Sequence, residues 1–264
     1  MNLNPSIRSA IIRTAASSAL MVALFAGTDR ASAAEIRLLS AAAMQSVFKE
    51  IAGEFERISG HRLTIAYTTV GGINQRLLAG EAADVVIGST LSMPALVKLG
   101  RIEAGRQTTI CKTAIGIVVP SGTAKPVVAS VEDFKNALLS AKVLVYADPV
   151  RGGAAGVHIA RVIEKLGIAE QLKSQITLGA GGDVTEVTLA QGAGALGMTQ
   201  VSEIVGKSGA EFVGPLPEPL QNYTVFVAGI PTNTQQREPA AALVEFLKSP
   251  TALAAIAAKG MQVD

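Results

Sequence analysis

The stretch that decides the fold is residues 36–89, which read IRLLSAAAMQSVFKEIAGEFERISGHRLTIAYTTVGGINQRLLAGEAADVVIGS. The apolar runs Ile36–Ser40, Leu63–Thr68 and Asp84–Ser89 predict three buried strands. Between the first two runs, apolar residues recur at helical spacing over Met44–Ile58. Strands that alternate with helices in this order predict a parallel sheet with right-handed crossovers.

A second set of the same kind lies further along the chain. It is predicted to contain helix Val131–Ser140, strand Lys142–Ala147, helix Ala155–Leu166, strand Gln175–Thr177, helix Val184–Gln191 and strand Ala195–Gly197. The apolar runs Ala114–Val119 and Thr224–Gly229 flank this set and predict strands that lead the chain into it and back. Two helices, Glu238–Lys248 and Thr251–Lys259, are predicted to follow.

These patterns predict an α/β protein with two lobes, each a mainly parallel sheet flanked by helices. Lobe 1 is expected to comprise residues 34–113 and 223–264, and lobe 2 residues 114–222. The chain then crosses twice between the lobes, near residues 113 and 223. We expect these two crossover segments to form a hinge.

Residues 1–33 carry the features of a secretory signal peptide. Arg8 and Arg13 precede an apolar stretch of about 13 residues, which is shorter than the roughly 20 needed to span a bilayer. Ala31-Ser32-Ala33 then offers a small-residue cleavage site before Ala34. We therefore expect an exported protein that works in the periplasm.

Charge and residue counts exclude several classes of protein. The chain has 23 Lys+Arg and 21 Asp+Glu, and the leader holds three basic residues and one acidic residue, which leaves 20 of each. Without a basic run, a nucleic-acid surface is not expected. One cysteine, Cys111, and two histidines, His61 and His158, provide no zinc cluster and no disulfide. We expect Cys111 to be a buried thiol, His61 to be solvated and His158 to be structural, with no metal or cofactor.

Four predicted strand-to-helix turns are rich in small residues. Ligands of open α/β sheets bind beyond the carboxyl ends of strands, where helix N-termini present backbone N–H groups. The turns are Ser40–Ala43, Thr68–Gly72, Asp148–Ala155 and Gly181–Val184, two in each lobe. This distribution predicts a ligand site between the lobes.

Particular segments then resemble a known family. They are Ser40–Ala42, Leu78–Val85 (LAGEAADV), Arg106-Gln107, Asp148-Pro149, Ala155-Gly156, Asp183-Val184, Leu196-Gly197 and Phe246–Pro250 (FLKSP). The chain resembles the periplasmic molybdate-binding component of ABC importers, within the two-lobe type II solute-binding protein superfamily, over essentially all of residues 34–264. The resemblance implies the periplasmic-binding-protein fold and a tetrahedral oxyanion held between the lobes by neutral donors.

The resemblance also implies which residues bind the ligand. By position they are Ala42 and Ala43 in the first turn, Thr69, Val70 and Gly71 in the second, backbone groups of Ala155 and Val184, and Gln200. Three side-chain donors of the family pattern are changed here: Ala43 replaces one hydroxyl, Val70 or Gly71 the second, and Gln200 a tyrosine. Each lost hydrogen bond to a charged group is worth about 1.5–3 kcal/mol.

Arg151 points to an alternative ligand. It lies just before two glycines, and a guanidinium there can bind a carboxylate or phosphonate with two parallel hydrogen bonds. An organic acid or phosphonate is therefore the alternative to a molybdate- or tungstate-like oxyanion. A solvent-facing Arg151 is the competing interpretation.

Three classes of function remain to be weighed. A hydrolase needs a nucleophile beside a base, and the chain has no G-x-S-x-G turn and no well-placed histidine. We expect a binding protein and not an enzyme: a monomer that delivers a small anion to the membrane permease of an ABC transporter. A sensor subunit that reports the same ligand to a receptor is the second alternative.

Overall fold

The computed structural model describes residues 33–263. The strands are β1 (Glu35–Ala41), β2 (Arg62–Thr68), β3 (Val85–Ser89), β4 (Thr108–Thr113), β5 (Ile115–Pro120), β6 (Val143–Ala147), β7 (Ile176–Gly179), β8 (Ala195–Gln200), β9 (Ala210–Pro215) and β10 (Thr224–Gly229). The helices are α1 (Gln45–Ser59), α2 (Val70–Leu78), α3 (Met93–Lys98), α4 (Val131–Ser140), α5 (Ala154–Lys165), α6 (Ala169–Leu172), α7 (Val184–Gln191), α8 (Arg237–Phe246) and α9 (Pro250–Ala258). Short 3₁₀ turns are η2 (Ala42–Met44), η3 (Pro149–Arg151), η4 (Val201–Glu203) and η5 (Glu218–Leu220). The predicted leader lies outside the described residues, apart from Ala33.

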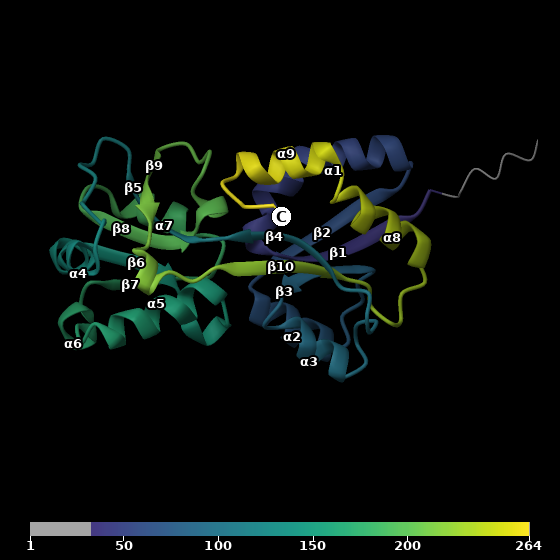
Figure 1. Ribbon diagram of the computed structural model, residues 1–264, viewed down its shortest axis with the longest axis horizontal. Helices are drawn as coiled ribbons and strands as arrows, with labels where there is room; N and C mark the ends of the chain where they lie inside the picture. Colours follow the sequence, from purple (N-terminus) through teal and green to yellow (C-terminus); the bar gives the residue numbers. More distant parts are fainter. Residues whose placement is uncertain (1–32, 264) are drawn as a thin grey trace, which may run out of the picture. The chain divides into compact units, whose positions relative to one another are not determined.

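The strands form two five-stranded sheets with the same topology. One sheet has the order β2-β1-β3-β10-β4 and the other β7-β6-β8-β5-β9. Two segments of chain join them, one from β4 to β5 and one from η5 to β10 (Figure 1). The two-lobe α/β fold predicted from the sequence is confirmed. We call the part built on the first sheet lobe 1 and the part built on the second lobe 2.

Each sheet is mainly parallel, as the sequence pattern predicts, with one strand that runs in the opposite direction. In lobe 1, β1 pairs in parallel with β2 and β3, whereas β10 pairs antiparallel with β3 and β4. In lobe 2, β6 pairs in parallel with β7 and β8, whereas β5 pairs antiparallel with β8 and β9. The antiparallel strands are those that enter from the other lobe, so they approach each sheet from the opposite direction.

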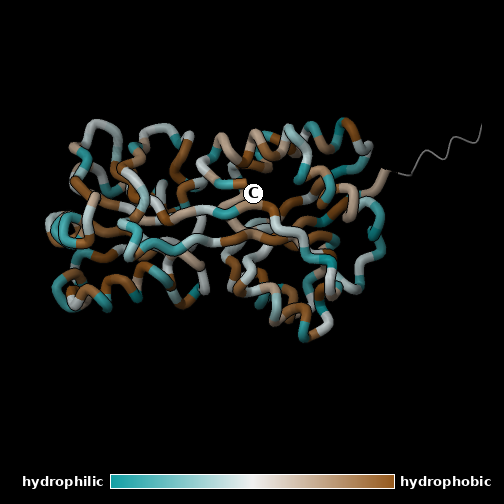
Figure 2. The backbone as a smooth tube through the Cα atoms, in the orientation of Figure 1, coloured by the Kyte–Doolittle hydropathy of each residue, from teal (hydrophilic) through white to brown (hydrophobic). Residues whose placement is uncertain are grey.

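Each lobe has its own apolar core. In lobe 1, Phe48 and Phe55 of α1 and Leu243 of α8 are buried against the sheet, and the rings of Phe55 and Phe246 lie 5.4 Å apart. In lobe 2, Phe134 of α4 is buried with the neighbouring helices and strands. Figure 2 shows hydrophobic residues along the strands, and hydrophobic residues that alternate with hydrophilic ones around the helices. Burial of the hydrophobic residues fixes how the helices cover the sheets.

Cys111 and His61 are both buried in lobe 1. The Sγ atom of Cys111 lies 3.4 Å from the sulfur of Met261 and 3.8 Å from that of Met44, and burial raises the thiol pKa to about 12. The expectation that His61 is solvated is wrong, because it is only 9% exposed and its Nδ1 accepts from the N–H of Ala34. His158 has a structural partner, with its Nε2 2.7 Å from the carbonyl of Leu220.

In the described part of the chain, no single helix is long and apolar enough to cross a membrane. Taken together, α8 and α9 reach that length and apolarity, but they meet at a bend of 59°. Ala240 and Leu243 of α8 and Ile256 of α9 are buried in the core of lobe 1.

Candidate functional site

A small cavity lies where the carboxyl ends of strands from both sheets meet. Its volume is about 40 Å³. From lobe 1 it is lined by Ala41, Ala42, Ala43, Thr68, Thr69, Val70, Thr224 and Phe226. From lobe 2 it is lined by Ala147, Gly153, Ala154, Ala155, Gly156, Gly181, Gly182, Thr199, Gln200 and Glu203. We call this space the interlobe cavity, and it occupies the position expected for a ligand site in such sheets.

Helix N-termini from both lobes border the interlobe cavity. Thr69 caps α2, and its hydroxyl accepts from the N–H of Gly72 at 3.0 Å. Val70, Ala154 and Ala155 occupy the first turns of α2 and α5, where backbone N–H groups have no carbonyl within their own helix to bond. These groups and the helix dipoles favour negative charge in the cavity.

The two lobes contact each other directly beside the cavity. The hydroxyl of Thr69 donates to the carbonyl of Arg151 at 2.6 Å, and the N–H of Gly71 donates to the carbonyl of Gly152 at 3.1 Å. On the other side, the hydroxyl of Ser46 donates to the carbonyl of Ser202 at 2.9 Å. The chain is therefore in a closed conformation.

Glycine allows the closest of these contacts. A Cβ atom at Gly71 would lie 2.8 Å from the Cα of Gly152 and 3.0 Å from its carbonyl oxygen. Both neighbours are backbone atoms, which cannot move aside as a flexible side chain can. The backbones of the two lobes approach this closely only because residue 71 has no side chain.

Six of the nine residues proposed from the sequence line the interlobe cavity: Ala42, Ala43, Thr69, Val70, Ala155 and Gln200. Gly71, Arg151 and Val184 are not among its lining residues. Gly71 instead bonds to Gly152 across the cleft. Val184 is fully buried in lobe 2, and its N–H bonds to the carbonyl of Gly181 at 3.4 Å.

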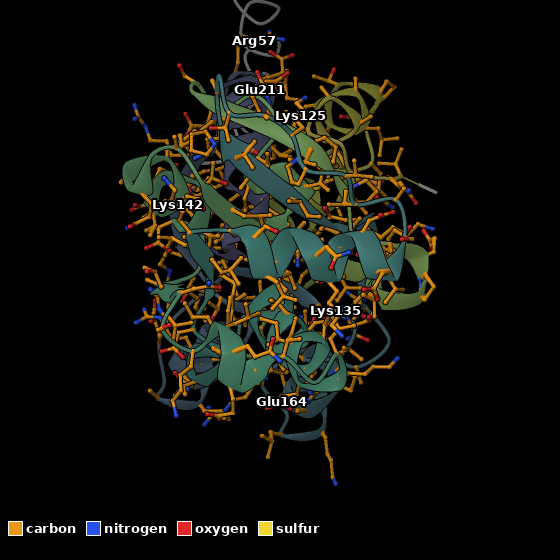
Figure 3. The ribbon with its side chains drawn as sticks, turned by 90° about the vertical axis from the view of Figure 1, so that its left-hand side faces the viewer. Arg57, Lys125, Lys135, Lys142, Glu164 and Glu211 are labelled. Atoms are coloured by element: carbon orange, nitrogen blue, oxygen red, sulfur yellow. The ribbon has the colours of Figure 1, made fainter. Side chains whose placement is uncertain are left out.

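Arg151 lies at the edge of the cleft with its side chain exposed. Its backbone carbonyl takes part in the contact between the lobes, and its guanidinium has no place in the wall of the cavity. Among the described residues that line the cavity, none is a lysine or an arginine. Figure 3 shows other charged side chains of lobe 2, such as Lys142 and Glu164, on its outer face.

Gln200 presents an unpaired oxygen. Its side chain is buried, with only 5% exposed, and Nε2 donates to the hydroxyl of Thr224 at 2.9 Å. Within the described chain, Oε1 of Gln200 has no hydrogen-bond partner. A buried acceptor without a partner costs about 1–3 kcal/mol, so Oε1 favours a group that donates a hydrogen bond to it.

Glu203 lines the cavity and was not predicted from the sequence. It lies in η4, three residues after Gln200, and is the one acidic residue among those lining the cavity. Burial raises its pKa to about 7, against hydrogen bonds from the Thr199 hydroxyl and the Gln200 backbone and the charge of Lys207, which lower it. The sequence feature that could have indicated Glu203 is its place three residues after Gln200, a predicted ligand residue at the end of β8.

A larger outer pocket adjoins the cavity. It has a volume of about 400 Å³ and shares Ala42, Gly182 and Glu203 with the wall of the cavity. Its other lining residues are Gln45, Ser46, Lys49, Glu50, Ser202, Val205, Gly206, Lys207 and Lys259. Glu203 therefore stands between the small cavity and this outer pocket.

Comparison with known proteins identifies relatives over nearly the whole chain. The family model for bacterial extracellular solute-binding proteins matches residues 36–262. The molybdate-binding protein ModA of Azotobacter vinelandii is 32% identical over 257 residues, which cover 92% of this chain and 96% of that protein. An aconitate isomerase from Pseudomonas sp. is 27% identical over 233 residues, covering 86% and 87%.

Solved structures show the same fold. The periplasmic molybdate-binding protein of Azotobacter vinelandii superposes with a TM-score of 0.73 at 19% identity. The superposition covers 87% of this chain and 99% of that one. Its two-lobe architecture is the architecture described above.

Proposed function

Because this chain belongs to the family of bacterial extracellular solute-binding proteins, we propose that it is the binding component of an ABC importer for a small tetrahedral oxyanion. The proposed ligand is of the molybdate or tungstate class, bound in the interlobe cavity. The relative at 32% identity is named a molybdate-binding protein, which supports this ligand class. Export to the periplasm through cleavage of residues 1–33 belongs to the same proposal.

The observation that carries the proposal is the size and chemistry of the cavity. Its volume of about 40 Å³ holds roughly three water molecules, since each needs about 10–15 Å³. That space suits the oxygens of one small oxyanion. Its wall offers first-turn N–H groups and threonine hydroxyls without a lysine or arginine, and Glu203 is its one acidic residue.

The ligand residues proposed from the sequence divide into two groups. We propose that Ala42, Ala43, Val70 and Ala155 bind through backbone N–H groups, and that Gln200 binds through the side-chain N–H that it does not donate to Thr224. Thr68 offers a hydroxyl in place of one changed family donor, whereas the Thr199 hydroxyl donates to Glu203. Thr69, Gly71 and Arg151 would hold the lobes together around the ligand, and Val184 would support the α7 turn.

Closure of the lobes is the signal for delivery in this proposal. A closed, ligand-bound monomer would dock on the permease of the importer, and opening about the β4–β5 and η5–β10 connections would release the anion. The organic-acid alternative that relied on Arg151 loses its support, since the guanidinium is not part of the cavity wall. A sensor role for the same ligand would use the same closed state.

A ligand panel tests the proposal directly. Purified residues 34–264 are heated with molybdate, tungstate, sulfate, phosphate, phosphonates or tricarboxylates, and the melting temperature is recorded. A ligand at 100 times its Kd stabilises the folded state by about 2.7 kcal/mol, which raises the melting temperature by a few degrees. A shift with molybdate and tungstate is the expected result. A shift with tricarboxylates alone would contradict it.

Glu203 favours a second candidate function, the isomerisation of an unsaturated acid. One relative is named aconitate isomerase. A carboxyl group with a pKa of about 7 is suited to take a proton from carbon and return it at neutral pH. Against this candidate, a tricarboxylate has three carboxyl groups to place, and the closed cavity holds roughly three water molecules.

The two candidates are separated by one incubation. The protein is mixed with cis-aconitate, and proton NMR follows the vinyl and methylene signals of both isomers. We propose that this chain is a binding protein and not an enzyme, so no conversion is expected. Conversion that is lost in Glu203→Gln would establish the isomerase instead.

A further inference from the structure

We infer that Glu203 couples capture of the anion to the uptake of one proton, so that the closed complex holds a proton that the separate partners do not. This inference rests on the proposed function and deepens it, since it names the residue that makes affinity depend on pH. The position of Glu203 in the wall of the interlobe cavity carries the inference.

The carboxyl group of Glu203 is held in place from both sides. The hydroxyl of Thr199 and the backbone N–H of Gln200 both donate to it. Its Oε1 lies 3.6 Å from the position that a Cβ atom would take at Gly182, a residue shared by the cavity and the outer pocket. Because Glu203 lines the cavity, an ionised Glu203 would face an anion bound there.

The neighbouring charges do not neutralise Glu203. Lys207 faces it, but the Lys207 ammonium is paired with Glu186, whose own charge opposes ionisation of Glu203. Lys259 in the outer pocket is paired with Glu50 at 2.9 Å, and Lys49 lines the outer pocket only. No arginine or lysine among the residues lining the cavity separates the carboxylate from the ligand.

Two acceptors facing one anion explain why a proton is needed. Gln200 Oε1 is an unpaired acceptor, and ionised Glu203 adds a second group that repels the oxygens of the ligand. Protonation turns Glu203 into a neutral donor that can hydrogen-bond the anion. An anion placed beside the group raises its pKa further, because like charges disfavour the ionised form.

The outer pocket connects the carboxyl group of Glu203 with solvent. Glu203 lines both spaces, so the carboxyl group can exchange its proton with solvent while the lobes are closed around the cavity. In this closed conformation the pKa of Glu203 is about 7, so the protonated form is present at pH 6.5. At pH 8.5 most molecules are ionised and must take up a proton when the anion binds.

Because binding takes up a proton, the affinity for the anion depends on pH. Affinity is highest at the acid side of the range and falls as pH rises through the pKa of free Glu203. Between pH 6.5 and pH 8.5 we expect the Kd for molybdate to rise about tenfold or more, with a limiting slope of tenfold per pH unit. Molybdate itself stays fully ionised in this range, so the slope belongs to the protein.

Isothermal titration calorimetry tests the inference. Molybdate is titrated into the protein at pH 6.5, 7.5 and 8.5, each in two buffers of different ionisation enthalpy, which gives both Kd and the number of protons taken up. The expected result is uptake that approaches about one proton at pH 8.5. In Glu203→Gln, uptake disappears and the Kd becomes independent of pH.

Two further variants make the test specific. Glu50→Gln removes an acid that lines only the outer pocket, and its pH slope should match that of the unchanged protein. Thr199→Val removes a donor that lowers the pKa of Glu203, so its slope should begin at higher pH. Thr199→Val also covers the case in which Glu203→Gln fails to fold, which melting curves would reveal.

The outcomes separate the inference from the proposed function. Molybdate binding with no proton uptake and no pH slope would overturn the inference and leave the proposed function standing. A slope that persists in Glu203→Gln would assign the proton to another group and also overturn it. Absence of molybdate binding at every pH, including pH 6.5, would remove the proposed function, and the inference with it.

Discussion

Each lobe holds a carboxylate whose pKa is shifted by its surroundings, and the two shifts have opposite directions. In lobe 1, burial alone would raise the pKa of Asp84, but hydrogen bonds from Arg37 and Thr234 outweigh burial and lower it. In lobe 2, burial dominates and raises the pKa of Glu203 to about 7. The difference lies in the donors around each group.

Asp84 has a full set of donors and an opposite charge. It accepts from the backbone N–H and the guanidinium of Arg37 at 2.9–3.1 Å, and from the hydroxyl of Thr234 at 2.7 Å. These bonds tie β1 and the segment before α8 to the start of β3. Among the described residues, no ion pair is found for Glu203, which lines a cavity and has Lys207 as the cation that lowers its pKa. A buried carboxylate that is fully bonded supports the fold, and one that is short of donors is available to a ligand.

Removing the lobe 1 carboxylate should have the largest effect on stability. Asp84→Ala leaves the Thr234 hydroxyl and the Arg37 guanidinium without their acceptor. We expect a loss of about 3 kcal/mol, the low end for a broken buried pair, because Arg37 is half exposed and regains water. Urea unfolding at pH 7 measures the loss. A change below 1 kcal/mol would mean that Asp84 does not hold these segments together.

Neutralising the lobe 2 carboxylate should have the opposite sign. The raised pKa of Glu203 means that the folded chain prefers the protonated form, so its ionisation destabilises the fold as pH rises from the unfolded value toward 7. Glu203→Gln should stabilise the protein by up to about 3 kcal/mol at pH 9, and little near pH 4. Thermal unfolding across this range provides the test. For Asp84 the linkage runs the other way, since its contribution is lost as pH falls through its lowered pKa.

Gly71→Ala should spare stability and impair ligand binding. Its new methyl group would meet the backbone of Gly152 only when the lobes are closed. We expect molybdate affinity to fall by ten- to a hundredfold, about 1.4–2.7 kcal/mol of binding energy. Titration calorimetry and urea unfolding distinguish the two effects. Gly53→Ala is the matched control, because nothing lies within 4 Å of its added carbon on α1.

Thr69→Val should show the smallest effect of the series. The hydroxyl caps α2 and also bonds to the carbonyl of Arg151 across the cleft. Loss of the cap costs about 1 kcal/mol of folding energy, and loss of the bond across the cleft weakens affinity by severalfold. Equal affinity in the variant and the unchanged protein would show that closure does not depend on this bond.

Much of the fold could be predicted from the residues. Alternating apolar runs and helical spacing located β1, β2, β3 and the α/β units of lobe 2, because buried strands and amphipathic helices leave clear periodicities. The strand β4 (TTICKT) was missed, since polar residues interrupt its short apolar part, and β9 was missed for a similar reason. The antiparallel pairing of β5 and β10 depends on contacts between distant segments, which no local pattern reports.

The cavity was predictable only in part. Small residues after strands located Ala42, Thr69 and Ala155, because helix starts and glycine-rich turns have local signatures. The exclusion of Arg151 and the inclusion of Glu203 follow from how the lobes close, which sequence spacing does not determine. Gln200 was located by position, and its unpaired oxygen became visible only in three dimensions.

Cys111, whose thiol is packed against the sulfurs of Met44 and Met261, can serve as a probe of unfolding in lobe 1. Cys111 is the only thiol, and Met261, which follows α9, covers its sulfur. A thiol-reactive dye can reach Cys111 when the C-terminal segment detaches or lobe 1 unfolds, whereas opening of the cleft leaves the thiol covered. The rate at which the dye labels Cys111 would therefore report unfolding of lobe 1 alone. Unfolding of lobe 2 would not change this rate.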